Sequence, residues 1–150
     1  LTNVTIKNVI ISDWWHGIYI QNSVNNVVAS NYITSNIENG IYIGPASPGN
    51  TLKDNIIDSN GNGIYLRSAG NVIFNNLLNN TQNFDVDASQ NVWNSSKLSV
   101  NNIMDGPHLG GNYWANPDGS GFSQTCTDSD GDGICDESYE LSANNIDIFP

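Results

Sequence analysis

One tetrapeptide returns along this chain at a fixed interval. Gly-Ile-Tyr-Ile begins at Gly17 and at Gly40, and Gly-Ile-Tyr-Leu begins at Gly63, which gives a period of 23 residues. An altered copy, Asn-Phe-Asp-Val, begins at Asn83, where Asn replaces a Gly that we expect to need a left-handed backbone. Because repeats of about 20 to 50 residues are typical of solenoids, propellers and arrays, the period limits the fold to these classes.

The pattern inside each repeat predicts strands and not helices. Apolar segments such as residues 4–6, 9–11 and 18–20 are three residues long, rich in β-branched side chains, and separated by Asn, Ser or Gly. None of them sustains a helical period. Three short strands and three turns form one coil of a parallel β-helix, whose strands pair from coil to coil at about 4.8 Å. We expect an all-β parallel β-helix of about four to five coils over residues 1–111.

The tetrapeptide also predicts which side chains form the core, since successive residues of a strand face opposite sides. The expected inward positions are Ile18, Ile20, Ile41, Ile43, Ile64, Leu66, Phe84 and Val86. The expected outward positions are Tyr19, Tyr42, Tyr65 and Asp85. An asparagine precedes an apolar pair in each repeat, and these residues predict a ladder of side-chain amides at one turn: Asn8, Asn31, Asn55 and Asn76.

The outward aromatic residues have two readings. Stacked tyrosines on the face of a solenoid stabilise neighbouring strands, and they also form platforms on which sugars stack. Trp14 and Trp15 likewise either fold over the edge of a coil or hold a sugar. The candidate sugar-stacking residues are therefore Trp14, Trp15, Tyr19, Tyr42 and Tyr65.

Charge excludes several classes of partner. The chain has 4 Lys and Arg residues against 15 Asp and Glu, which gives a net charge of -11. A basic stripe is missing, so binding to nucleic acid or to an anionic membrane is not expected, and cations are the plausible partners. No apolar run reaches the length of about 18 residues that a transmembrane helix needs.

Three features favour a location outside the cytoplasm. The chain begins Leu1-Thr2-Asn3 without Met, as a processed or trimmed product does. Asn-x-Ser/Thr sequons predict glycosylation at Asn3, Asn79 and Asn94. Cys126 and Cys135 bracket an acidic loop, and we expect a disulfide between them that contributes about 2 to 3 kcal/mol in the chain-entropy model. We expect an extracellular or cell-surface protein.

The last third of the chain has a different character, and we assign residues 112–150 to a small irregular module. Its centre, residues 128–136, has carboxylates at loop positions 1, 3, 5 and 9 and a glycine at position 6, as in an EF-hand calcium loop. Position 12 is Tyr139, so Asp136, Glu137 or Glu140 would complete the ligand shell. The sequence predicts a calcium cofactor held by Asp128, Asp130, Asp132, the carbonyl of Ile134, Asp136 and Glu137.

Essentially the whole chain resembles a known family. The coils resemble the right-handed parallel β-helix repeats of NosD-like and carbohydrate-associated surface proteins. The segments at residues 110–114, 128–136 and 145–150 resemble the C-terminal end of such repeats in archaeal surface proteins. The resemblance implies a right-handed β-helix with a closing unit, and the family name carries a copper-binding label. Copper prefers convergent His, Met or Cys, whereas His16 is expected to lie far from Met104 and His108.

Catalysis finds little support in the predicted register. Glycosidases use two carboxylates across one cleft, and lyases use a Lys or Arg base near a bound cation. Aligning the coils on the asparagine ladder places Asp58 beside Ile11, Thr34 and Asn79, so no pair of carboxylates forms. Asp85 and Asp87 share an outer face, but only the distant Arg67 is basic there. We expect no enzymatic activity.

Three functional classes remain. The first is a calcium-stabilised structural protein of the cell surface whose open first coil stacks head to tail on another copy, as a homo-oligomer that extends into filaments. The second is a carbohydrate-binding surface module with glycans as partners. The third is a polysaccharide lyase or glycosidase. The sequence favours the first class.

Overall fold

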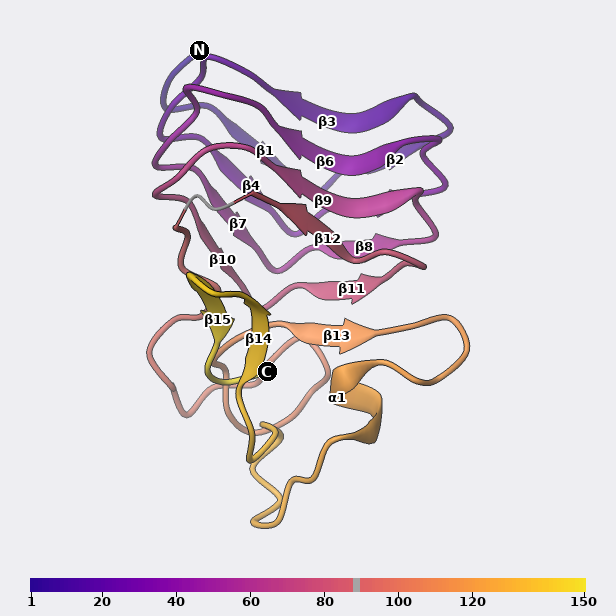
Figure 1. Cartoon of the computed structure of the whole chain (residues 1–150), viewed down its shortest axis with the longest axis vertical. Coiled ribbons are helices and arrows are strands. Elements are labelled where there is room, and N and C mark those ends of the chain that lie inside the picture. Colours follow the sequence, from indigo (N-terminus) through magenta and orange to yellow (C-terminus); the bar gives the residue numbers. More distant parts are fainter. Residues whose placement is uncertain (88–89) are drawn as a thin grey trace.

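The computed structural model describes residues 1–87 and 90–150, and it contains a parallel β-solenoid (Figure 1). Its first sheet has the order β1-β4-β7-β10, and these strands are Thr5–Lys7, Val27–Ala29, Thr51–Lys53 and Val72–Phe74. The second sheet has the order β13-β11-β8-β5-β2, with strands Tyr113–Ala115, Leu77–Asn79, Ile56–Asp58, Tyr32–Thr34 and Ile10–Ser12. The third has the order β12-β9-β6-β3, with strands Phe84–Val86, Asn62–Leu66, Asn39–Ile43 and His16–Ile20. The predicted fold class is confirmed.

The C-terminal segment adds little regular structure. It contains the one-turn helix α1 (Phe122–Thr125) and an antiparallel hairpin of β14 (Tyr139–Ser142) and β15 (Asn145–Asp147). The β13 strand continues the second sheet beyond β11, with Trp114 paired to Leu78. In Figure 1 the hairpin, in yellow, lies against the last coil, at the opposite end of the solenoid from the N-terminus.

The aliphatic core follows the predicted alternation. Ile41, Ile43, Ile64 and Leu66 have no exposed surface, and the partly buried Phe84 and Val86 pack against them. Tyr42 and Tyr65 are paired across the outer face. The strands of this sheet are therefore oriented as the sequence predicts.

The reason for glycine at the repeated position is not the left-handed backbone that the sequence suggested. Gly40 has no left-handed backbone, but a Cβ on it would lie 2.8 Å from the Gly63 carbonyl oxygen and 2.8 Å from the Ile57 side chain. Gly17 and Gly63 meet equally close atoms of the neighbouring coil. Lack of space between coils, and not backbone conformation, therefore excludes a side chain at this position.

Three ladders of asparagine amides connect the coils at their corners. In the ladder at the second sheet, Asn31 Nδ2 donates to Asn55 Oδ1 at 3.0 Å, Asn55 Nδ2 to Asn76 Oδ1 at 2.9 Å, and Asn76 Nδ2 to Asn112 Oδ1 at 2.9 Å. The other two ladders run through Asn26, Asn50, Asn71 and Asn91, and through Asn36, Asn60, Asn80 and Asn83. Because each amide donates toward the C-terminal end, their dipoles add.

The expected membership of Asn8 in the ladder is wrong. Asn8 is exposed with φ of 57°, and the ladder position in the first coil is Val9, whose N–H donates to Asn31 Oδ1. The first coil is one residue shorter here than the alignment assumed. As a result Asp58 aligns with Ser12 and not with Ile11.

The second-sheet ladder ends on a buried carboxylate. Asp147 has no exposed surface, and its Oδ2 accepts from Asn112 N at 2.7 Å, Asn112 Nδ2 at 3.2 Å and Trp114 Nε1 at 3.0 Å. Its Oδ1 accepts from Phe149 N at 3.2 Å. Burial raises the pKa of Asp147 to about 6, although these N–H donors act in the opposite direction. Asp147 therefore joins the hairpin to the last coil.

Candidate functional site

The outward tyrosines form a continuous stack on the third sheet. The ring centroids of Tyr19 and Tyr42 are 4.5 Å apart and the planes differ by 2°, while those of Tyr42 and Tyr65 are 5.1 Å apart with a 9° difference. The Arg67 guanidinium covers the next face of Tyr65 at 3.7 Å and pairs with Asp85 at 2.7 Å. Since Tyr42 and Tyr65 have a ring or a guanidinium on each face, these two rings present their edges and hydroxyls to a ligand, whereas Tyr19 is 54 % exposed.

A second column of polar residues runs beside the tyrosines. It consists of the residues that precede each repeated glycine, namely His16, Asn39 and Asn62. Asn62 Nδ2 donates to Asn39 Oδ1 at 3.1 Å, and Asn39 Nδ2 lies 3.0 Å from His16 Nδ1. Because an amide nitrogen only donates, His16 Nδ1 is the acceptor and Nε2 carries the proton. That Nε2 lies 3.4 Å from Glu38 Oε2.

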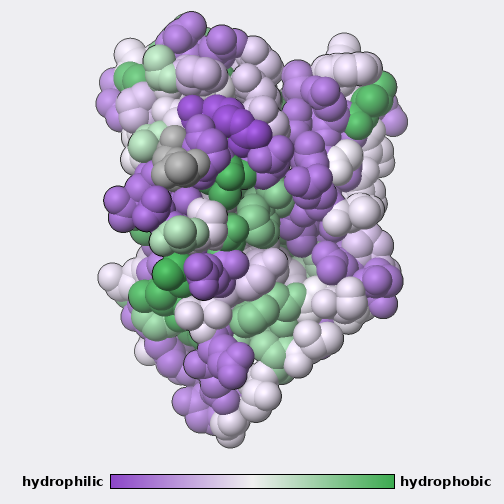
Figure 2. Space-filling view, viewed as in Figure 1, coloured by the Kyte–Doolittle hydropathy of each residue, from purple (hydrophilic) through white to green (hydrophobic). Residues whose placement is uncertain are grey.

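The tyrosines, this column and Glu38 enclose a hollow of about 260 Å³, which we call the tyrosine groove. Its residues are His16, Tyr19, Glu38, Asn39, Tyr42, Asn62 and Tyr65. Figure 2 shows the molecule from the same side as Figure 1, and hydrophilic side chains predominate over its upper part, where the first coils lie. Desolvation and the neighbouring Tyr19 and Tyr65 raise the pKa of Tyr42.

Trp15 stands beside the groove in a fixed position. Its Nε1 donates to Glu38 Oε2 at 3.0 Å, yet 59 % of the residue is exposed. Trp14 is 66 % exposed. An exposed indole held by a hydrogen bond gives a ligand apolar contact area at little cost in side-chain entropy. Of the candidate sugar-stacking residues, Trp14, Trp15 and Tyr19 expose more than half of their surface, whereas Tyr42 and Tyr65 are covered by their neighbours in the stack.

In the aspartate loop, residues 128–136, carboxylate side chains accept hydrogen bonds from backbone N–H groups of the same loop. Asp128 Oδ1 accepts from Gly131 N and Asp132 N, and its Oδ2 accepts from Gly133 N at 2.9 Å. Asp132 Oδ1 accepts from Ile134 N, and its Oδ2 pairs with the Lys97 ammonium, which lowers the pKa of Asp132. The ammonium therefore already supplies a counter-charge to this loop.

Only some of the remaining candidate metal ligands lie close to one another. Asp128, Asp130 and Asp136 bring oxygens within 4.8 Å of one another, and Asp136 also accepts from Ser129 Oγ at 2.6 Å. Glu137 is exposed, and Glu140 lies on β14 with Ile146 as its cross-strand partner. The side chain of Ile134 is buried. The structure thus gathers three of the predicted carboxylates and holds Asp132 against Lys97.

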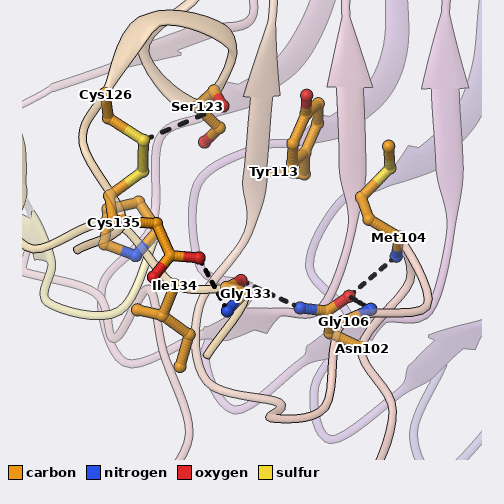
Figure 3. Close-up of a pocket in the computed structure, with 11 residues that line it drawn as sticks. Asn102, Met104, Gly106, Tyr113, Ser123, Cys126, Gly133, Ile134 and Cys135 are labelled. Carbon is orange, nitrogen blue, oxygen red and sulfur yellow. Dashed lines mark hydrogen bonds between the residues drawn. A yellow bond between two sulfur atoms is a disulfide. The ribbon is translucent and has the colours of Figure 1, made fainter. Parts of the chain in front are cut away.

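The predicted disulfide between Cys126 and Cys135 is present. It borders a hollow of about 230 Å³ that Figure 3 shows, with Tyr113, Met104 and Asn102 on the opposite side. Asn102 Oδ1 accepts from Met104 N and Gly106 N, and its Nδ2 donates to the Gly133 carbonyl. These bonds fix the segment before β13 against the aspartate loop.

The three sequon asparagines lie in different surroundings. Asn3 is exposed, and Asn94 is partly buried with Nδ2 donating to the Ser95 carbonyl at 3.0 Å. Asn79 lies in β11, and its Nδ2 donates to Asp58 Oδ1 at 2.8 Å. Attachment of a glycan to Asn79 would replace one of the two Nδ2 hydrogens and leave one for this hydrogen bond.

One comparison with known proteins gives a match. The model of a family described as periplasmic copper-binding protein (NosD) matches residues 2–119. No curated protein and no solved structure is similar enough to this chain to count as a match. Within the described residues, no helix has the length and apolar character needed to cross a membrane.

The expected calcium cofactor is corrected by this match, because the family is described as binding copper. In this loop the Lys97 ammonium pairs with Asp132 Oδ2, so it balances part of the charge that a cation would otherwise balance. Copper does not fit these residues. Among the described residues, the group of three or more His, Cys, Asp or Glu ligands consists of carboxylates, and both cysteines are bonded to each other.

Proposed function

The chain belongs to the NosD family of periplasmic proteins, and from that premise we propose that it is an extracytoplasmic β-helix module that binds glycans in the tyrosine groove. The observation that carries the proposal is the exposed but fixed Trp15 beside a hollow lined by amides, hydroxyls and one carboxylate. Glycan sites combine an apolar face for a sugar ring with polar groups that fix its hydroxyls. The family's description agrees with the expected location outside the cytoplasm.

We propose binding without cleavage. Hydrolysis of a glycoside uses a pair of carboxylates, and the lining of the tyrosine groove has one, Glu38. That carboxylate is hydrogen-bonded by Trp15 and faces His16, which suits it to accept hydrogen bonds from a bound sugar.

Trp15→Ala is expected to weaken glycan binding at least tenfold, because it removes the exposed ring and releases Glu38. The experiment is a glycan array followed by isothermal titration of the glycan with the strongest signal. Tyr32→Ala is the matched control, since Tyr32 is also exposed but lies on β5 in another sheet. Equal affinity of wild type and Trp15→Ala, or no glycan bound by wild type, would contradict the proposal.

A second candidate function, end-to-end association, is favoured by the first coil. Within the described residues, β1, β2 and β3 are the outermost strands of their sheets, and Val4, Val9 and Ile10 expose 37 %, 41 % and 76 % of their surface. Such edges pair with other strands. The hairpin and its aromatic neighbours lie at the opposite end of the solenoid. Head-to-tail association would place the first coil of one copy against this hairpin of another.

Ile10→Asp is expected to reduce this association, since a charge at the edge opposes strand pairing. Light scattering at high concentration measures it. A wild-type protein that stays monomeric over the whole concentration range would eliminate end-to-end association, whatever the variant does.

A further inference from the structure

The polar column beside the tyrosines changes its side chain at the first coil. The second and third coils carry Asn39 and Asn62, and the first carries His16 at the equivalent position. The imidazole is larger than the amide and lies against both neighbouring tyrosines, with ring centroids 5.4 Å from Tyr19 and 5.4 Å from Tyr42. The space between the two columns is therefore filled at the first coil.

Two polar neighbours, Asn39 and Glu38, hold His16 in this position. Asn39 donates to its Nδ1, Glu38 faces its Nε2, and the side chain is 19 % exposed. Glu38 is itself held by Trp15 Nε1. A side chain with contacts on two rings and a hydrogen bond at Nδ1 does not swing aside without losing them. The groove thus has a blocked end at the first coil and extends over the second and third coils.

The charge of the lining restricts the ligand as well. Glu38 is a carboxylate, and the amides and hydroxyls around it are neutral. The nearby Arg67 is paired with Asp85. With a net charge of -11 on the protein, a sugar that bears a carboxylate or sulfate would be repelled, whereas a neutral or amino sugar would not.

We propose that the tyrosine groove binds the terminal units of neutral or amino-sugar chains, and that His16 excludes the interior of such chains. The inference rests on the proposed glycan binding, and it adds the class of sugar and the part of the chain that is bound. The open part of the groove lies between Tyr42 and Tyr65 on one side and Asn39 and Asn62 on the other, and we expect it to hold about two sugars. A polymer then binds by its end.

The test uses β-1,4-linked oligomers of glucose and of glucosamine with one to six units, and the two polymers, with isothermal titration as the readout. For wild type, affinity should rise from one unit to two and then stay level, and each polymer should bind one protein per chain end. His16→Asn places in the first coil the amide that the next two coils carry. This variant should gain about tenfold for three or more units and bind along the polymer.

The possible outcomes separate glycan binding itself from the recognition of chain ends. Wild-type binding in proportion to polymer length, or His16→Asn binding no differently from wild type, would overturn end recognition while leaving glycan binding intact. Binding only of acidic sugars would overturn the proposed class. Absence of binding to every glycan on the array would reject the proposed function and the inference together. Thermal unfolding of His16→Asn shows whether the variant is folded.

Discussion

Asp147→Ala is expected to lower the free energy of unfolding by about 4 kcal/mol, the largest effect that we predict for a single side chain. Alanine would leave the backbone N–H groups of Asn112 and Phe149 and the Trp114 indole N–H without their acceptor at a fully buried position. The Asn112 amide would keep its bonds to the Ile73 and Trp93 carbonyls. A buried donor without a partner costs about 1 to 3 kcal/mol. Guanidinium unfolding followed by tryptophan fluorescence measures the loss.

Asp147→Asn is the matched control. Its carbonyl oxygen would replace the Oδ2 atom that accepts three hydrogen bonds, so that only the Phe149 N–H faces an amide nitrogen. This variant should lose less than half as much as Asp147→Ala. Equal losses in both variants would show that the hydrogen-bond acceptor is not what the last coil requires.

Asp147 also imposes a pH dependence with a defined sign. The pKa is about 6 in the folded chain against 3.8 for an ordinary aspartate, so the folded state holds the proton more tightly. The stabilisation is complete below pH 3.8 and is lost as pH rises to 6, by about 3 kcal/mol. Hydrogen bonds lower the pKa of Asp118 and Asp132. The stability that these two carboxylates contribute is therefore lost only as the pH falls below 3.8, outside the range in which Asp147 titrates. Asp147→Asn should remove the slope between pH 4 and 6.

Asn55→Ala is expected to cost about 3 to 4 kcal/mol. The amide is fully buried, its oxygen accepts from the backbone N–H and the side chain of Asn31, and its nitrogen donates to the Val28 carbonyl at 2.9 Å. Alanine leaves these groups unpaired in the middle of the solenoid and adds a cavity. Chemical denaturation gives the loss of free energy directly.

Asn8→Gly provides the comparison for the ladder, since Asn8 precedes an apolar pair as Asn55 does but is exposed. Its φ of 57° suits glycine, so the change should leave stability within about 0.5 kcal/mol. A loss at Asn8 as large as that at Asn55 would return Asn8 to the ladder and contradict the register described above.

The sequence predicts the solenoid because its signals are periodic. The tetrapeptide recurs at a fixed interval, so the core ladders of Ile41 and Ile64 and the outer stack of Tyr42 and Tyr65 follow from one repeat. Asn8 was misassigned because the first coil is shorter, which local sequence does not reveal. The clash that excludes a Cβ at Gly40 involves atoms of the next coil and is equally invisible locally.

The polar half of the tyrosine groove could have been found from the sequence. His16, Asn39 and Asn62 each precede the repeated glycine, and the same alignment shows the change from His to Asn. The role of Asp147 could not have been found from the sequence, because its partner Asn112 lies 35 residues earlier, on the other side of the aspartate loop and the disulfide. The aspartate loop led to a wrong cofactor prediction, because its spacing matches a calcium loop whereas the matching family is described as binding copper.

The most direct test of glycan binding is a crystal structure of the protein soaked with the oligosaccharide that gives the strongest array signal. The account predicts sugar density between the tyrosine stack and the Asn39–Asn62 column, with a ring against Trp15 and a hydroxyl or ammonium group on Glu38. Density at another face, with the tyrosine groove empty at a saturating concentration, would contradict it.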